Sequence, residues 1–192
     1  GFGRSPALAY NADGQLTTVT TPDARVIGYA QDNQGRLSSV TYPDGKARSF
    51  LYENPAFPQA LTGIVDESGS RWATFSYDAT GRARSTELAG SAERYQVDYL
   101  YTGTATVTDP LGTPRLYLYA TTNGKLAVTG SSLPSGTGHA DAGRRILDAN
   151  GLIISEADFK ESRTNTTWDV ARRLPLSVTR GVGTPEEQAV TT

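Results

Sequence analysis

The clearest candidate for chemistry in this chain surrounds its one histidine, His139. Asp141 follows two residues later and several serines lie nearby, so a Ser-His-Asp relay is the reaction to consider. Such a relay needs a rigidly held base and an oxyanion hole. His139 lies instead in a Gly/Ser-rich segment, and the chain has no Gly-x-Ser-x-Gly elbow. We therefore expect an exposed loop histidine, no catalytic residue and no enzymatic activity.

Recurrent aspartates are the second candidate, because calcium binds carboxylate and carbonyl oxygens. They stand in an Asp-x-x-Gly pattern at Asp32–Gly35, Asp78–Gly81 and Asp148–Gly151, with Asn11–Gly14 as a variant that contains Asp13. Calcium β-roll repeats are nonapeptides dense in glycine, whereas most of a repeat separates these turns. We interpret the aspartates as turn formers: Asp accepts hydrogen bonds from its own downstream backbone, and Gly adopts a positive φ. We expect no metal and no cofactor.

These turns belong to a repeated unit. Residues 32–44 resemble residues 11–23, and Leu16/Leu37, Val19/Val40 and Pro22/Pro43 are each offset by 21 residues. A second turn in the unit centres on Pro-Asp, where Pro suits a hairpin tip. Its copies are Pro22-Asp23, Pro43-Asp44-Gly45 and, in altered order, Asp109-Pro110-Leu111-Gly112. A period in the twenties predicts about seven or eight stacked supersecondary units with a shared core.

The segments between the turns are short and rich in Thr, Val, Tyr and Leu, and none has a long 3.6-residue apolar period. We predict an all-β fold, an array of short antiparallel β-hairpins. Apolar residues three apart, as in Leu16/Val19, Leu37/Val40 and Leu61/Ile64, favour a β-bulge that re-aims the second residue. The predicted strands are Leu16–Thr21, Arg25–Ala30, Leu37–Tyr42, Ala47–Tyr52, Ile64–Asp66, Trp72–Tyr77, Tyr95–Tyr101, Thr104–Thr108, Arg115–Ala120, Leu152–Glu156, Thr166–Trp168 and Leu174–Thr179.

Residues 1–192 are predicted to form a single array, with insertion loops at 54–60 and 130–143 that interrupt the period. The sequence has no methionine, and its last repeat stops in mid-unit. We therefore expect a fragment of a longer array, whose unpaired strand edges would lead to self-association.

Composition excludes several classes of site and partner. The formal net charge is −2 and basic residues are scattered among acidic ones, which argues against a nucleic-acid partner. No apolar stretch approaches the ~20 residues that span a bilayer, and no signal peptide stands in this sequence. The absence of cysteine excludes disulfides, thiol nucleophiles and zinc-thiolate sites.

The motif Tyr77-Asp78-Ala79-Thr80-Gly81-Arg82 resembles the tyrosine-aspartate (YD) repeat of the Rhs family, which is Tyr-Asp-x-x-Gly-Arg followed by Leu. Asp32–Leu37 is similar, with Gln31 in the Tyr position. Leu147–Leu152 and Trp168–Leu174 are degenerate copies, the latter without its Gly, and Trp168–Glu187 also resembles a segment common in bacterial Rhs proteins. The resemblance extends from Tyr10 to about Val190.

The repeat positions that we single out have structural roles, and we expect Arg36 and Arg82 to brace neighbouring turns through carboxylates. These positions are Tyr10, Gly14, Tyr29, Asp32, Gly35, Arg36, Pro43, Asp44, Tyr77, Asp78, Gly81, Arg82, Asp148, Gly151, Trp168 and Asp169.

The resemblance implies a strip of hairpins that spirals, as a curved sheet, into a hollow shell. In bacterial Rhs proteins and insecticidal toxin complexes such a shell encloses a C-terminal toxin, and teneurins carry a similar shell outside the cell. The resemblance thus implies that this chain is a wall segment of a polymorphic toxin used in interbacterial competition. Such a toxin is secreted or delivered by a secretion system, and the partners of this segment are the rest of the shell and the enclosed toxin. Family shells often end in a self-cleaving aspartate motif. Asp109–Gly112 is only superficially similar to it and lies within the array, so we assign it no catalysis.

An adhesion module is the alternative. Repeated Tyr and Trp residues could stack against sugars, and curved repeat surfaces commonly bind partners. This hypothesis predicts a glycan or cell-surface partner. An aromatic position that recurs at the repeat period is, however, more typical of a stacked ladder within a sheet.

Overall fold

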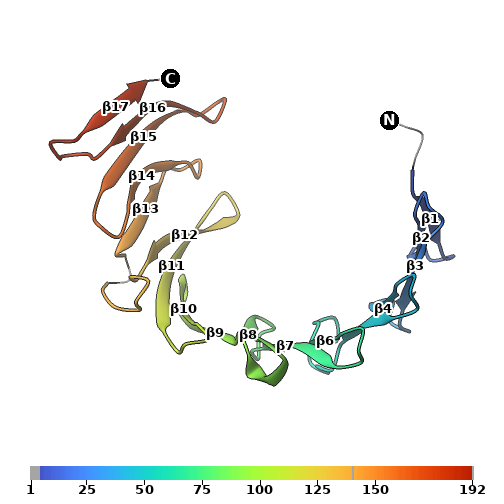
Figure 1. Ribbon diagram of the computed structural model, residues 1–192. Coiled ribbons are helices and arrows are strands. Elements are labelled where there is room, and N and C mark those ends of the chain that lie inside the picture. The colour runs from blue at the N-terminus through green and yellow to red at the C-terminus, as the bar shows by residue number, and fades with distance from the viewer. Residues whose placement is uncertain (1–4, 140, 192) are drawn as a thin grey trace. The chain divides into compact units, whose positions relative to one another are not determined.

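The computed structural model describes residues 5–139 and 141–191, which contain seventeen strands and one short 3-10 segment (Figure 1). The chain divides into two compact units, Gly1–Arg94 and Tyr95–Thr192. No helix in the described part of the chain is long and apolar enough to cross a membrane. These strands confirm the predicted all-β class.

The first unit is an antiparallel meander in which each strand pairs with the next, from β1 to β8. Since consecutive strands pair antiparallel and all except β5 and β6 are joined by turns of a few residues, the unit is a series of hairpins, as predicted. Its elements are β1 (Ala7–Tyr10), β2 (Leu16–Thr20), β3 (Val26–Gln31), β4 (Leu37–Thr41), β5 (Ala47–Leu51), β6 (Gly63–Val65), β7 (Arg71–Tyr77), β8 (Ala83–Leu88) and the 3-10 segment Ala89–Ser91.

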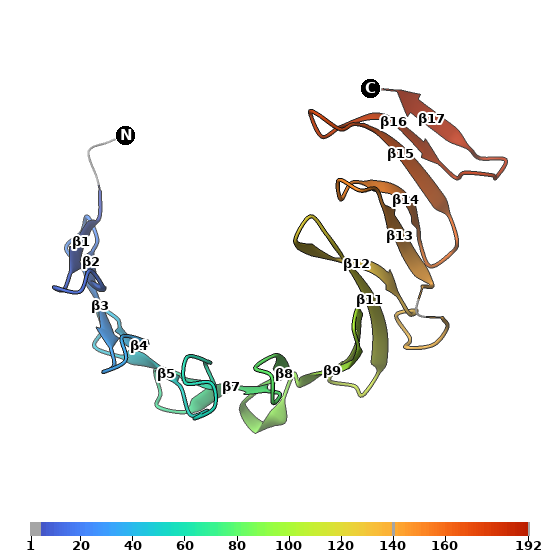
Figure 2. The same ribbon diagram turned by 180° about the vertical axis from the view of Figure 1, so that it is seen from behind.

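The second unit is a meander of the same kind, from β9 to β17, seen from behind in Figure 2. The predicted bounds of β9 and β10 agree with the structure. Its strands are β9 (Tyr95–Tyr101), β10 (Thr104–Thr108), β11 (Pro114–Thr122), β12 (Lys125–Ser131), β13 (Gly143–Leu147), β14 (Ile153–Ala157), β15 (Arg163–Asp169), β16 (Leu174–Arg180) and β17 (Gln188–Thr191).

Five strands were not predicted: β1, β8, β12, β13 and β17. Their sequences are rich in Ala, Gly, Gln or charged residues, which have low intrinsic strand preference. They are strands because each forms a ladder with a neighbour, and a ladder depends on the partner as much as on the strand itself.

A bulge follows the turn in both hairpins that carry the repeated Leu and Val. Tyr10 pairs with Leu16 and Ala9 with Thr18, so Thr17 is the extra residue on β2. Ser38 has the same place on β4. These two bulges were predicted from the three-residue spacing. The third prediction was wrong: Leu61 precedes β6, and the extra residue there is Trp72, on β7.

The predicted shared core is not what holds the strands together. Only Ala73, Ala105 and Leu152 are buried hydrophobic residues among the described ones, and none of the large side chains in that part of the chain is fully buried. Within each unit the strands form one layer, and most of their residues are half-buried or exposed. Its stability must therefore come from the backbone ladders and from contacts between turns.

Candidate functional site

One backbone geometry serves both kinds of turn. In the Asp-x-x-Gly turn, Asp32 N donates to Arg36 O at 2.9 Å, and Gly35 N donates to Asp32 O at 3.0 Å. In the Pro-Asp turn, Tyr42 N donates to Lys46 O at 2.8 Å, and Gly45 N to the Tyr42 carbonyl at 2.9 Å. Pro43 is the first of the three loop residues. Both are three-residue hairpin loops that end in a left-handed residue, with φ of 75° at Gly35 and 81° at Gly45.

The side chain of the leading Asp closes its own turn. Asp32 Oδ1 accepts from the N–H groups of Gln34 at 2.9 Å and Arg36 at 3.0 Å. Asp44, in a Pro-Asp turn, accepts only from Lys46 N, at 3.1 Å. The double acceptance recurs at Asn11, Asp66, Asp78, Asp109, Asp148 and Asp158. Gly14, Gly81 and Gly151 have a positive φ in the corresponding turns.

These hydrogen bonds keep the carboxylates ionised. The Arg36 side chain, first of all, lowers the pKa of Asp32. The Thr80 hydroxyl lowers that of Asp78, and the Leu152 N–H lowers that of Asp148. Within residues 5–139 and 141–191, no three His, Asp or Glu side chains lie close enough to hold a metal ion.

Arg36 and Arg82 pair with the aspartate of their own turn. Arg36 Nε lies 2.7 Å from Asp32 Oδ2, and Arg82 Nε lies 2.7 Å from Asp78 Oδ2. For Arg36, the expectation that a carboxylate contact joins neighbouring turns was therefore wrong. Arg36 reaches the next loop in another way, by donating to the Pro58 carbonyl and lying 4.5 Å from the centre of the Tyr52 ring.

The segment 54–60 occupies the place of a turn between those at 32–36 and 78–82. Asn54 Oδ1 accepts from the N–H groups of Ala56 and Phe57, as the turn aspartates do from theirs. The Phe57 ring lies against Gly81, where an added Cβ would be 2.9 Å from it. Arg36 and Phe57 thus link three successive turns into a column along one edge of the sheet.

The segment 130–143 is also less irregular than its composition indicates. Gly130 and Ser131 end β12, and Gly143 begins β13. Between them, Leu133–Thr137 has the same turn, with Leu133 N donating to Thr137 O at 3.0 Å. Arg115 Nε donates to the Pro134 carbonyl at 2.7 Å, so this turn too is held by its neighbour.

The Tyr position of the repeat holds neighbouring hairpins together. Tyr77 Oη donates to Leu61 O at 2.7 Å, and Tyr52 Oη donates to Leu37 O at 3.1 Å. Gln31 Nε2 donates to Leu16 O and Trp168 Nε1 to Ile153 O, both at 2.8 Å. Each of these four bonds, which we call clasps, spans strands whose ladder has only three residue pairs.

Three other repeat positions predicted from the sequence, two of them tyrosines and one a turn aspartate, form no clasp. Tyr29 pairs with Val40 inside β3, so that Gln31 is the clasp residue there. Tyr10 ends β1 and is 57% exposed. Asp169 Oδ1 accepts from Arg172 N at 3.0 Å, and Arg173, with φ of 58°, supplies the left-handed residue in this turn without Gly.

An ion-pair network in the first unit was not predicted. Arg71 donates to both carboxylate oxygens of Glu53, at 3.1 and 2.8 Å, and to the carbonyl of Thr62 at 3.0 Å. Hydrogen bonds from Arg71 and Thr62 lower the pKa of Glu53. Gly63 leaves the space for this guanidinium, because a Cβ there would lie 2.5 Å from Nη2. The missing side chain at Gly63 is the one sequence signal that could have indicated it.

His139 is exposed in the loop before β13, and it lines a hollow together with Asp141. Within the described residues, the His139 side chain forms no hydrogen bond or ion pair. A Ser-His-Asp relay would require a serine and an aspartate side chain hydrogen-bonded to the imidazole, and the described residues supply neither to His139.

The comparisons with known proteins agree on repeat and fold. Residues 10–47 match the family model described as RHS Repeat. No curated protein matches the chain. The crystal structure of TcdB2-TccC3 has a TM-score of 0.66 at 13% identity, over 96% of this chain and 11% of that one. That of TcdB2-TccC3-Cdc42 has a TM-score of 0.55 at 13% identity, over 91% of this chain and 11% of that one.

This chain therefore spans about a tenth of the length of the solved structures that it matches. At these identities the likeness shows the fold, and the family match identifies the repeat that builds it. Residues 10–47 thus match an RHS repeat, and the chain has the fold seen in part of the TcdB2-TccC3 structure.

Proposed function

We propose that this chain is a structural wall segment of an Rhs shell that encloses a C-terminal toxin or other cargo. The observation that carries the proposal is the single-layer sheet with no fully buried large side chain among the described residues. A one-layer sheet of this kind is suited to form the wall of a shell, with one face inside and the other outside. An independently folded domain would instead bury its apolar residues in a core between two layers.

The chemistry of the repeat supports a structural role. The turn carboxylates accept hydrogen bonds from their own backbone, and the clasp donors are bonded to carbonyls in or just before the preceding strand. These polar groups are therefore used in hydrogen bonds that hold the turns and strands together. We infer that the chain has no catalytic activity, and that its partners are further shell repeats and the cargo. Secretion, or delivery by a secretion system, belongs to the same proposal.

Protection of the cargo tests the proposal. In the full-length protein that contains these residues, limited proteolysis should leave the region C-terminal to the shell intact. We expect Gly81→Trp to expose that region to protease, because the new side chain would collide with Phe57 within the column of turns. Gly124→Trp is the matched control, since it places the same side chain at a glycine of similar positive φ, where nothing lies within 4 Å of a Cβ. Equal cleavage of the region with and without an intact shell would refute encapsulation.

A further inference from the structure

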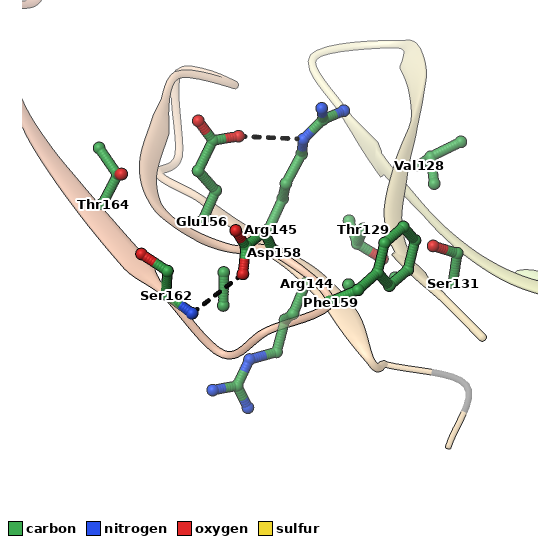
Figure 3. A pocket seen from close by; sticks show the side chains of 13 residues that line it. Val128, Thr129, Ser131, Arg144, Arg145, Glu156, Asp158, Phe159, Ser162 and Thr164 are labelled. Carbon is green, nitrogen blue, oxygen red and sulfur yellow. Dashed lines mark hydrogen bonds and ion pairs between the residues drawn. The ribbon is translucent and has the colours of Figure 1, made fainter. Parts of the chain in front are cut away.

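The weakest junction of the second unit lies between β12 and β13. These strands share only two residue pairs, Gly130 with Arg144 and Ser131 with Gly143. The residue in the clasp position at the end of β13 is Leu147, whose side chain has no hydrogen-bond donor. Beyond the two pairs the strands separate, and a hollow of about 410 Å³ lies beside them (Figure 3). This volume is within the range typical of small-molecule sites.

An aromatic ring forms one wall of the hollow. Phe159 lies over Gly143, where a Cβ would be 2.9 Å from the ring, so Gly143 provides a flat seat for it. Phe159 nevertheless remains 45% exposed as a residue. Figure 3 shows Phe159 beside Ser131 and Thr129 of β12. A seated but exposed ring is suited to stacking against a ligand.

The polar lining is rich in unused hydroxyl groups. Two pairs of strand hydroxyls elsewhere bond to each other, Ser76 to Ser85 at 2.6 Å and Thr167 to Ser177 at 2.7 Å. The hydroxyls that line the hollow have no hydrogen-bond partner within the part of the chain that the structure describes. They belong to Thr129, Ser131, Ser162 and Thr164.

The charges in the hollow largely balance. Arg145 Nε lies 3.4 Å from Glu156 Oε2, and the two side chains extend to the same side in Figure 3. Asp158 accepts from the Ser162 N–H and is thus committed to its turn. The lining therefore offers no excess of positive charge for a phosphate or an acidic peptide. A guanidinium and a carboxylate side by side can, however, donate to and accept from neighbouring hydroxyls.

We propose that this hollow binds a neutral saccharide. The pyranose ring stacks on Phe159, and its hydroxyls bond to the Arg145–Glu156 pair and to the free hydroxyls of β12 and β15. Such a ligand combines an apolar C–H face with many donors and acceptors, which is the combination that the lining presents. The site lies on the sheet itself and needs no enclosed cargo, so it is independent of the shell function proposed above.

Titration of the ¹⁵N-labelled chain with lactose, cellobiose and N,N′-diacetylchitobiose tests the proposal. We expect at least one of these probes to shift the amide resonances of Ser131, Gly143 and Phe159. We expect Phe159→Leu, which keeps an apolar side chain over Gly143 but removes the flat ring, to weaken binding by about tenfold. Glu156→Gln should weaken it as well, while the rest of the spectrum stays unchanged.

Tyr101→Ala is the matched control, because Tyr101 is an aromatic residue of the same unit that is 80% exposed and lies outside the hollow. This variant should bind as the unchanged chain does. Absence of shifts with all three probes would refute the proposal, and so would binding that Phe159→Leu leaves unaltered. Neither result would bear on encapsulation, which is measured by protease protection.

Discussion

Two Pro-Asp turns, one with a left-handed alanine and one with a left-handed glycine, make a matched pair for measuring backbone strain. The turns Thr21–Arg25 and Tyr42–Lys46 share the Pro-Asp sequence and the same backbone hydrogen bonds. Their last loop residues are Ala24, with φ of 62°, and Gly45, with φ of 81°. We predict that Gly45→Ala destabilises the chain and that Ala24→Gly stabilises it.

The magnitude follows from two opposing terms. An L residue in the left-handed region costs about 1–2 kcal/mol relative to Gly. Replacing Gly by Ala also lowers the entropy of the unfolded chain, which returns about 0.4–1 kcal/mol. No atom lies within 4 Å of a Cβ built on Gly45, so no steric term enters. The expected change in the free energy of unfolding is therefore about 1 kcal/mol for each substitution, with opposite signs.

Urea unfolding followed by far-UV circular dichroism measures both changes, and the double variant should lie close to the unchanged chain. Gly28→Ala is the control, because Gly28 lies in β3 without a positive φ and its Cβ would meet Thr41 at an ordinary 3.8 Å. This variant should be neutral or slightly stabilised. The reasoning fails if Gly45→Ala is as harmless as Gly28→Ala.

Gly63→Ala should displace the Arg71 guanidinium and break its pair with Glu53, which costs about 1 kcal/mol in urea unfolding, and an unchanged midpoint would contradict this. Tyr77→Phe should cost about 1 kcal/mol by removing one clasp, whereas Tyr101→Phe, at an exposed hydroxyl, should cost nothing measurable. Acid should destabilise the chain: the turn carboxylates have a lowered pKa when folded, so their contribution is complete above the ordinary Asp pKa of about 4 and is lost as the pH falls further. The urea concentration at half-unfolding, measured from about pH 6 down to about pH 2.5, reports this loss. A urea midpoint that stays constant as the pH is lowered below about 4 would argue against it. Among the described residues, the exposed strands β1 and β17 each pair along one side only, so light scattering should show association that increases with concentration; a monomer at every concentration would rule this out.

The features that could be predicted from the sequence are local ones. An Asp-x-x-Gly turn contains its own acceptor and its own left-handed residue, so Asp32 and Gly35 specify it without help from the rest of the chain. The bulges at Thr17 and Ser38 were predictable because the spacing of Leu and Val reports which face each residue takes. At Leu61 the same spacing failed, since this residue precedes the strand that it was expected to join.

The contacts that could not be predicted join residues on different strands. Glu53 and Arg71 are 18 positions apart, and they meet because Gly63 of β6 pairs with Leu51 of β5 on one side and with Thr74 of β7 on the other. The expected core failed for a related reason. A repeat period indicates that units stack, but it does not say whether a second layer covers the sheet.

The clasp position shows what the repeat requires of its side chains. Tyr77, Trp168 and Gln31 differ in shape, yet each donates one hydrogen bond to a carbonyl in or just before the preceding strand. The requirement is a donor of sufficient reach across a three-pair ladder, so an aromatic ring is not essential. This explains how the sequence motif can degenerate while the architecture persists. Leu147 occupies the same position without a donor, at the junction with only two pairs, and there the hollow lies beside the separating strands. A surface able to bind a ligand thus arises where the repeat loses its clasp.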